Sequence, residues 1–472
     1  MALMAVMMAL VPMTDPTETR YGSLAANMAR TGNFLVPMYT HQGRYQSFDG
    51  KPPLFFQAGG VACKVFGVNE FAARLPSMLS ALAVIGMVWF TLRRLSGARA
   101  AANAALMCAT GGVFYLFSGL CMTDMVLTFC TTGALCAYML FAGSEGRAKK
   151  ISSVAFFAFL GLGMLAKGPV AVVLCGLPVF VYVCAGKRWK ELGRHAWLLG
   201  PLAFLAIALP WFALMAARDP GFLEYFFINE NFLRFLTPNY DDRYGSPHVF
   251  FKGMALVWFA VVNVPWLLLS LGCALTGRGT RRLCARGDFS GHPALSLALA
   301  GFVCMTGFWC LTSLAQIQYL LPTAPMFAIW LAMRLEAWQL AEKPWMARVV
   351  KGLALVTCAV IMIGLGIAIW LGHEVSGKMP KWMYREVARI RDETPEYADA
   401  KFFFAKGAPY SAEFYLPAGS WNVATNNVAD APALSADDFL FITKRDLDKL
   451  DAPPARKVAL KSGKWTVYAP VE

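Results

Sequence analysis

Long apolar runs separated by short charged clusters make up most of the chain as far as residue 372. A transmembrane helix needs about 20 predominantly apolar residues, and most of these runs approach that length. Runs that contain Gly or Pro also qualify, because neighbouring helices can satisfy the backbone there. The pattern predicts spans at about residues 71–92, 100–118, 124–143, 152–166, 169–185, 196–217, 253–276, 293–313, 319–333 and 349–372.

Residues 1–13 are apolar but too short to cross a bilayer, and they lack the basic stretch that opens a signal peptide. We interpret them as the end of a first span that begins upstream. The expected fold is therefore a polytopic α-helical membrane protein with about 11 transmembrane helices.

The segment 14–68 is too polar to span and too long to be a simple turn. Apolar side chains recur in it at helical spacing, at Tyr21, Leu24, Ala25 and Met28. Residues 16–30 therefore predict an amphipathic helix lying on the membrane surface, and residues 52–66 predict a second interfacial helix.

The composition changes after residue 373. Residues 380–393 suit a helix, and short runs rich in aromatic and β-branched residues suit strands at 401–404, 438–442, 458–461 and 465–469. We predict two domains: a membrane domain at 1–372 and a small soluble α/β domain at 373–472.

Charge indicates how the spans are oriented. The chain is 57% hydrophobic, only 15% charged, and carries a formal net charge of +14. Basic residues gather in five connections between alternate spans. The groups are Arg93, Arg94 and Arg99; Arg147, Lys149 and Lys150; Lys187, Arg188, Lys190 and Arg194; Arg278, Arg281, Arg282 and Arg286; and Arg334, Lys343, Arg348 and Lys351. The positive-inside rule places these connections in the cytoplasm, so we do not interpret the charge as a nucleic-acid site.

With eleven spans, the remaining connections all face the other side. They include segment 14–68, the turns at Asp124 and Lys167, the loop 218–252, Gln316–Tyr319 and the C-terminal domain. The outer face is thus the expected working face. The twelve cysteines show no CxxC or Cys/His spacing, so no disulfide framework or Cys-based metal site is predicted.

The segment Asp15-Pro16-Thr17-Glu18 follows the first apolar run. Asp15 as N-cap, Pro16 at the first helical position and Glu18 three residues after the cap would form a capping box. The other interpretation is chemical, because a carboxylate on the working face can accept a proton or bind a substrate. Of the two interpretations, we favour helix capping for Asp15 and a chemical role for Glu18.

Lys51-Pro52-Pro53 opens the second interfacial helix. A lysine at a helix N-terminus opposes the helix dipole, unless an anion lies between the cation and the free N–H groups. We therefore favour a phosphate site over an interfacial lysine whose stem snorkels along the apolar surface.

Two more charged residues lie in outward turns. Asp124 stands alone between two apolar runs, where it is either an N-cap of the next span or a functional acid, and we favour function. Lys167 precedes Gly168-Pro169 in a tight turn, and we favour a structural or snorkelling role for it.

The loop 218–252 alternates aromatic and polar residues, as expected for a surface that binds a sugar or an amphiphile. An interfacial aromatic belt is the other interpretation. Within it, His248 becomes a candidate ligand beside Lys252 and opposite the acids. Tyr319, outside this loop and taken alone, is typical of a belt residue.

Several of these motifs occur together in a familiar order. They are D-P-T-E-T-R-Y at 15–21, G-K-P-P-L-F-F at 50–56, F-G-V-N-E-F-A-A-R-L-P-S at 66–77, T-D-M-V-L-T-F at 123–129, K-G-P-V-A at 167–171, E-N-F-x-R-F-L-T-P at 230–238 and Y-L-L-P at 319–322. In this order the chain resembles the bacterial GT-C membrane glycosyltransferases of the aminoarabinose transferase and protein mannosyltransferase superfamily. The resemblance covers about residues 10–335.

The resemblance implies a transferase that moves a sugar from a polyprenyl phosphate, such as undecaprenyl phosphate, to a lipid or glycan acceptor such as lipid A. It implies an inner-membrane protein whose active site and C-terminal domain face the periplasm. A protein hydroxyl is the alternative acceptor. A lipid or solute transporter is less favoured, because the charges gather at one face and no repeat is visible.

Carried over residue by residue, the resemblance assigns roles to the motifs. The implied catalytic acids are Asp15, Glu18 and Asp124, and the implied donor-phosphate ligands are Lys51, Lys252 and Tyr319. The expected substrate-binding residues are Arg20, Asp49, Arg234 and Tyr244, and His248 is the candidate ligand for a divalent metal ion. No cofactor is required, and we expect a monomer that binds the lipid donor, the acceptor and the bilayer but no nucleic acid.

Two positions depart from the aminoarabinose transferases. Those enzymes typically read D-P-D-E where this chain has Thr17 before Glu18, and F-E-K-P where this chain has Gly50 before Lys51. The departures bear on the first catalytic acid, on any metal site and on aminoarabinose as the sugar.

Overall fold

The structure is a computed structural model of the whole chain, and it describes residues 1–41, 44–237, 248–275, 292–370, 380–416, 419–423, 428–450 and 452–471. The chain divides into two compact units. The first comprises Met1, 49–55 and 76–362, and the second comprises 2–48, 56–75 and 363–472. Each unit is described by itself below.

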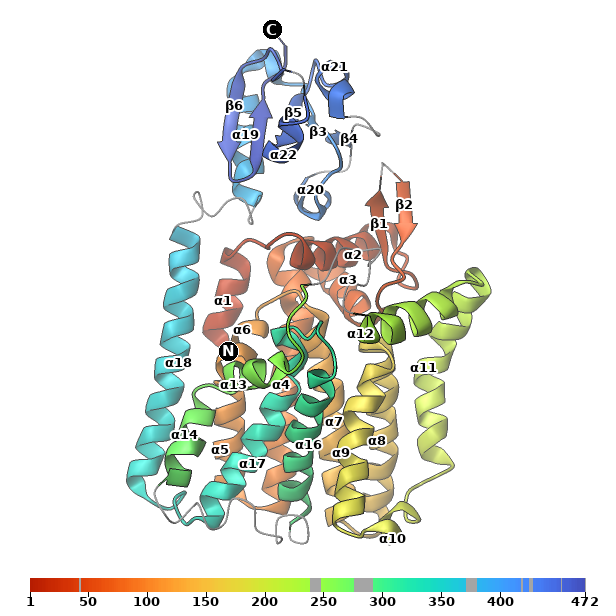
Figure 1. Cartoon of the computed structure of the whole chain (residues 1–472), viewed down its shortest axis with the longest axis vertical. Coiled ribbons are helices and arrows are strands. Elements are labelled where there is room, and N and C mark those ends of the chain that lie inside the picture. Colours follow the sequence, from red (N-terminus) through yellow and green to blue (C-terminus); the bar gives the residue numbers. More distant parts are fainter. Residues whose placement is uncertain are drawn as a thin grey trace. The chain divides into compact units, whose positions relative to one another are not determined.

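The first unit is a bundle of apolar helices (Figure 1). The helices are α4 (Glu70–Leu95), α5 (Ala98–Ala109), α6 (Gly112–Phe117), α7 (Thr123–Gly143), α8 (Gly146–Lys167), α9 (Val170–Ala185), α10 (Trp189–Leu192), α11 (Leu199–Arg218), the π-helix η1 (Glu224–Leu233), α12 (Arg234–Leu236), α13 (Met254–Val262), α14 (Trp266–Leu275), α16 (Pro293–Cys310), the 3-10 helix η2 (Ile317–Leu320), α17 (Thr323–Ala337) and α18 (Pro344–Trp370). Two of these helices, α4 and α18, lie partly in the second unit.

Among the described residues, six helices are long and apolar enough to cross a membrane, or seven if one bent pair forms a single span. The six are α4, α7, α8, α11, α16 and α18, and each corresponds to a predicted span. Other predicted spans are broken or short. Residues 100–118 form α5 and α6, the described part of 253–276 forms α13 and α14 with a bend of 96°, and α9 has 16 residues. The expected count of eleven spans stays a prediction.

Neighbouring segments satisfy the backbone at the bend between α13 and α14. Pro265 has no N–H to continue the helical ladder, and the N–H of Gly112 donates to the carbonyl of Val264 at 3.1 Å. The side chain of Asn263 donates to Phe259 O at 2.8 Å and to Thr323 Oγ1 at 3.3 Å. An interrupted apolar run is thus accommodated inside the bundle.

Helix α7 lies at the centre of this bundle and contacts α8, α9 and α16 (Figure 1). Small residues allow the helices to approach closely. A Cβ on Gly163 in α8 would lie 2.6 Å from the Cβ of Ala171 in α9, so only glycine fits there.

The second unit contains the segment predicted at 14–68 except for residues 49–55, which belong to the first unit. Its N-terminal part forms α1 (Ala2–Leu10), α2 (Thr17–Thr31), an antiparallel hairpin of β1 (Met38–His41) and β2 (Arg44–Ser47), and most of α3 (Leu54–Phe66). Helices α2 and α3 confirm the helices predicted at 16–30 and 52–66. The hairpin was not predicted.

The C-terminal part of the second unit is a mixed α/β fold with a five-stranded sheet of order β4-β3-β5-β7-β6. Its elements are α19 (Lys381–Glu393), η3 (Pro395–Tyr397), β3 (Phe402–Phe404), α20 (Tyr410–Tyr415), β4 (Trp421–Val423), η4 (Val428–Asp430), α21 (Ala431–Leu434), β5 (Phe439–Thr443), α22 (Lys444–Leu447), β6 (Val458–Ser462) and β7 (Trp465–Tyr468). Strand β3 is parallel to β4 and β5, while β7 pairs antiparallel with β5 and β6.

The core of this sheet is aromatic. Phe402, Phe404 and Phe441 pack with Val467 and with Val387 of α19, and all of them are buried. The helix and the four strands predicted from the sequence are present, whereas β4 was missed. Its three residues are half-buried or exposed, so they lack the apolar run that revealed the others.

Candidate functional site

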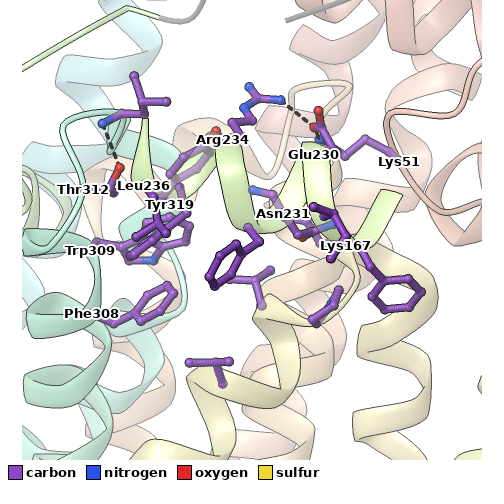
Figure 2. Close-up of a pocket in the computed structure, with 18 residues that line it drawn as sticks. Lys51, Lys167, Glu230, Asn231, Arg234, Leu236, Phe308, Trp309, Thr312 and Tyr319 are labelled. Carbon is purple, nitrogen blue, oxygen red and sulfur yellow. Dashed lines mark hydrogen bonds and ion pairs between the residues drawn. The ribbon is translucent and has the colours of Figure 1, made fainter. Parts of the chain in front are cut away.

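A cavity of about 530 Å³ opens in the first unit (Figure 2). Residues from η1, α12, α9, α16 and η2 line it, together with Lys51 and Lys167. Most of the wall is apolar: Val170, Val173, Phe227, Ile228, Phe232, Phe235, Leu236, Phe308, Trp309 and Leu314. One end carries charged side chains, so the cavity is amphipathic.

Aromatic side chains from distant segments form one wall of the cavity (Figure 2). Phe235 of α12 stacks on Phe308 of α16 with ring centroids 4.8 Å apart. Trp309 lies 4.6 Å from the ring of Tyr319 in η2. Tyr319 therefore lies in the cavity wall, and its role at the donor phosphate stays a prediction.

The charged end is organised around Glu230 of η1. Its Oε1 accepts hydrogen bonds from Lys51 Nζ and, at 2.5 Å, from Nη1 of Arg234 (Figure 2). The Glu230 side chain is only 2% exposed, and its Oε2 has no hydrogen-bond partner among the described residues. One buried carboxylate thus holds two cations at the rim of an apolar cavity.

Lys51 is held where its charge is costly. Its side chain is 17% exposed, and Nζ also donates to Gly50 O at 2.8 Å. Burial lowers the pKa of Lys51, the carboxylate of Glu230 raises it, and the charge of Arg234 lowers it. The snorkelling interpretation of Lys51 is wrong, because its amine points into an ion pair.

Lys167 ends α8 and forms a buried ion pair with Asp124 in the first turn of α7, at 2.5 Å. A cation at a helix C-terminus and an acid at a helix N-terminus both complement the helix dipole. The ammonium of Lys167 also lies 4.2 Å from the centroid of the Tyr319 ring.

These contacts correct two interpretations. Lys167 does not snorkel, since it is buried and lines the cavity. Asp124 does not cap α7, because the N-cap position is Met122 and no side chain caps the helix there.

The turn after Lys167 fixes the neighbouring π-helix. Gly168 has a φ of 82°, which favours glycine, and a Cβ there would lie 2.7 Å from Cζ of Phe226 in η1. The turn K-G-P therefore lets η1, with Glu230 and Asn231, lie close to Lys167. Isolated π-helical turns occur frequently at functional sites.

The remaining predicted residues of this unit lie elsewhere. Asp49 is buried and is not among the residues that line the cavity. Lys252 and His248 are exposed, and neither lines the cavity. Tyr244 lies outside the described residues. In the described part of the chain, no group of three or more His, Cys, Asp or Glu side chains is arranged to hold a metal ion.

The acids at the start of the chain belong to the second unit. The capping-box interpretation of Asp15 is wrong, because Pro16 is the N-cap of α2 and no side chain caps it. Asp15 Oδ1 instead accepts from the hydroxyl of Thr19, and Oδ2 accepts from Ser411 Oγ at 2.6 Å. Burial raises the pKa of Asp15, while these hydrogen bonds lower it.

Glu18 and Arg20 have different surroundings. Glu18 is buried and pairs with the fully buried Arg74 at 2.7 Å, while Nη1 of Arg74 also donates to Met8 O at 2.9 Å. The guanidinium of Arg20 lies 5.7 Å from the ring centroid of Tyr410. Glu18 thus helps to hold the chain between α1 and α2 through Arg74.

Sequence reasoning missed Glu230 as a site residue and favoured a structural role for Lys167. A signal for Glu230 was present, because Glu230 and Arg234 are four residues apart, the spacing at which helical side chains meet. For Lys167 the signal is weaker, since its partner Asp124 is 43 residues away.

The comparisons with known proteins bear on this geometry. A model of the family described as dolichyl-phosphate-mannose-protein mannosyltransferase matches residues 5–226. The chain is 29% identical over 300 residues to the undecaprenyl phosphate-alpha-4-amino-4-deoxy-L-arabinose arabinosyl transferase of Edwardsiella ictaluri, a match that covers 61% of this chain and 51% of that protein. The corresponding protein of Enterobacter sp. is 27% identical over 378 residues, which cover 76% of this chain and 64% of that protein.

The resemblance to the GT-C membrane glycosyltransferases is confirmed. The crystal structure of ArnT from Cupriavidus metallidurans bound to undecaprenyl phosphate superposes with a TM-score of 0.73 and covers 99% of this chain and 96% of ArnT. At 20% sequence identity, this likeness shows that the two chains share a fold. The chain is a multi-pass membrane protein, and it spans about half to two thirds of the length of these curated relatives.

Proposed function

We propose that this chain is a glycosyltransferase that moves a sugar from a polyprenyl phosphate to a lipid or glycan acceptor such as lipid A. The observation that carries the proposal is the amphipathic cavity. An apolar wall suits a prenyl chain, and cationic groups at one end suit its phosphate. The relatives named for undecaprenyl phosphate support this donor class.

The site residues receive roles in this reaction. Lys51 and Arg234 bind the donor phosphate at the end of the cavity, and Tyr319 adds a hydroxyl donor beside them. Lys167 holds the carboxylate of Asp124 in place through their ion pair. Lys252, Tyr244, Asp49 and Arg20 stay predictions as further ligands of donor or acceptor.

In the transfer step, an oxygen of the acceptor forms a bond to the anomeric carbon, and the bond from that carbon to the phosphate oxygen breaks. The electron pair leaves with the polyprenyl phosphate, so negative charge grows on the phosphate. Fixed cations in a water-poor site stabilise this charge. When the acceptor is a hydroxyl, its proton passes to a carboxylate, for which Asp15 is the candidate, while Asp124 orients the acceptor. We assign Glu18 the support of this segment through Arg74.

We place the reaction at the periplasmic face of a bacterial inner membrane, with the C-terminal domain on the same side. The positive-inside pattern of Lys and Arg supports this orientation. It also fits a donor and an acceptor that are both lipids of that membrane.

The test measures transfer directly. Membranes that contain the full-length chain receive a polyprenyl-phosphate sugar, and lipid mass spectrometry follows one added glycosyl mass on the acceptor lipids. The same mass should be lost from the lipids of a deletion strain. No transferred sugar in the assay and unchanged lipids in the deletion strain would overturn the proposal.

A second candidate is transfer to a protein hydroxyl. It is supported by the match of residues 5–226 to the protein mannosyltransferase family model. Mass spectrometry of periplasmic proteins distinguishes the two acceptors, because glycopeptides lost on deletion, with lipids unchanged, would favour protein transfer.

A further inference from the structure

The short helix α20 in the C-terminal part of the chain makes several hydrogen bonds to the N-terminal segment, and both lie in the second unit. Ser23 Oγ donates to Tyr410 O at 2.8 Å, and Arg30 Nη1 donates to Glu413 O at 2.9 Å. The backbone N–H of Met13 donates to the hydroxyl of Tyr415 at 2.8 Å. Residues 383 to 402 positions apart in sequence therefore form one polar interface.

The carboxylate of Asp15 is part of this interface. Ser411 Oγ donates to Asp15 Oδ2 at 2.6 Å, and Ser411 itself lies 3.0 Å from the hydroxyl of Tyr384 in α19. Thr19 donates to the other carboxylate oxygen. Ser411 is fully buried, so its hydroxyl is shielded from water and bonds within the protein.

A second anchor fixes α20 independently of Asp15. The side chain of Glu413 accepts from Asn27 Nδ2 at 2.6 Å and from the backbone N–H of Thr40 at 2.8 Å. Asn27 belongs to α2 and Thr40 to strand β1. Helix α20 is thus held on both α2 and the hairpin, which defines where Ser411 meets Asp15.

We propose that Ser411, oriented by Tyr384, is a positioning residue for Asp15, so that the C-terminal domain sets the geometry and the charge state of this acid. The inference rests on the proposed function, in which Asp15 is a candidate catalytic acid. It adds that the C-terminal domain takes part in building the acid's environment.

The charge state follows from the groups that face Asp15. Burial raises the pKa of Asp15, whereas the Ser411 hydroxyl, the Thr19 hydroxyl and the charge of Lys464 lower it. Tyr384 faces the same carboxylate through Ser411, and burial raises its own pKa, so it stays neutral. Without the Ser411 hydroxyl, the ionised form of Asp15 loses a donor and its pKa rises further.

The experiment uses the full-length protein in membranes and compares Ser411→Ala with the wild type. Carbodiimide labelling of the Asp15 peptide across a pH series, measured by mass spectrometry, reports the protonation of Asp15 without turnover. We expect the labelling midpoint to rise by roughly one pH unit, the size of a lost hydrogen bond to a charged group. The acid limb of the pH profile of transfer should move by the same amount.

Two further variants keep the test decisive. Tyr384→Phe removes only the hydroxyl behind Ser411, so the midpoint should rise by less but in the same direction. Ser435→Ala is the control, because Ser435 is a fully buried serine of the same domain whose hydroxyl binds Ala431 O. It should leave the midpoint unchanged.

The outcomes separate this inference from the proposed function. If Ser411→Ala folds and labels as the wild type does, the positioning role of Ser411 is wrong, whatever the transfer activity. If the midpoint shifts but the wild-type protein transfers no sugar, the contact with Asp15 stands and the glycosyltransferase proposal fails.

Discussion

Two parts of the molecule hold shielded carboxylates in different surroundings. Beside the cavity, Asp124 pairs with Lys167, and Glu230 pairs with Lys51 and Arg234. Around α20, neutral groups donate hydrogen bonds to the carboxylates: Ser411 and Thr19 to Asp15, and Asn27 and Thr40 to Glu413.

The difference separates fixed charge from charge that can titrate. A carboxylate paired with a cation keeps its charge, but removing either partner leaves the other buried without it. Neutral donors do not fully offset burial, and the pKa values of both Asp15 and Glu413 are raised. We infer that the cavity presents paired charges to an anionic ligand, while the α20 region responds to pH.

The largest effect is expected for the substitution Lys51→Met. It removes a cation that we assign to the donor phosphate, and losing one such stabilising group typically costs roughly 100-fold in turnover. Transfer rates in membranes, normalised to the amount of folded protein, provide the measurement.

Lys190→Met is the matched control for Lys51. Lys190 is an exposed lysine of α10 and does not line the cavity. Its loss should leave transfer within about twofold of the wild type. Equal activity of the two variants would contradict a role for Lys51 at the phosphate.

Asp124→Asn should mainly reduce stability. It leaves Lys167 buried without this carboxylate, and breaking such a pair costs about 3 kcal/mol. Adding Lys167→Met should restore much of the thermal stability but not transfer. Thermal unfolding in detergent measures the first effect, and the membrane assay measures the second.

The control for Asp124 is an exposed ion pair. Glu342 binds Arg99 at 3.1 Å on the surface of the same unit. Glu342→Gln should cost less than about 1 kcal/mol, because exposed pairs contribute little. If Asp124→Asn were as mild as this control, the Asp124–Lys167 pair would not be the fixed charge that the comparison assumes.

Glu230→Gln should strengthen the binding of an anionic ligand. Glu230 competes with a phosphate for Lys51 and Arg234, so its neutralisation should lower the inhibition constant of polyprenyl phosphate by roughly tenfold. Transfer should slow, because the same phosphate is the product that must leave.

The pH dependence provides a second measurement for Glu230. Its carboxylate raises the pKa of Lys51 against the effect of burial. In Glu230→Gln this support is lost, so Lys51 deprotonates at lower pH and the tighter inhibition should fade as the pH rises. Inhibition constants that are unchanged at both neutral and alkaline pH would show that Glu230 does not compete for the cations.

Sequence patterns predicted the structural features that are set by residues close together in the chain. The apolar runs predicted the long helices, and the 3.6-residue period predicted α2. A lysine before two prolines, at a helix N-terminus where it opposes the helix dipole, predicted Lys51 as a site residue. Contacts between distant segments were not predictable: no local pattern links Lys51 to Glu230, 179 residues away, or Asp15 to Ser411, 396 residues away. The capping box failed for the same reason, because one partner of Asp15, Ser411, lies in a distant segment of the chain.

The smallest effect is expected for Glu413→Gln. Because burial raises the pKa of Glu413, its folded state holds a proton that the unfolded chain releases, and stability falls as the pH rises from the unfolded to the folded pKa. The glutamine side chain of the variant would mimic the protonated form and keep an oxygen acceptor. The thermal midpoint of the variant should therefore fall less between pH 5 and pH 8, by a few degrees at most.

Asp446 gives the opposite sign in the same domain. Burial alone would raise its pKa, but hydrogen bonds from Lys449 and Thr443 bring the pKa below its usual value. Its stabilisation is present at neutral pH and is lost as the pH falls through the folded pKa, so Asp446→Asn should lose more stability at pH 8 than in acid. If the stability of Glu413→Gln and of Asp446→Asn, each relative to the wild type, changed with pH in the same direction, the comparison would fail. The type of hydrogen-bond donor, neutral or cationic, would then not determine how these two carboxylates respond to pH.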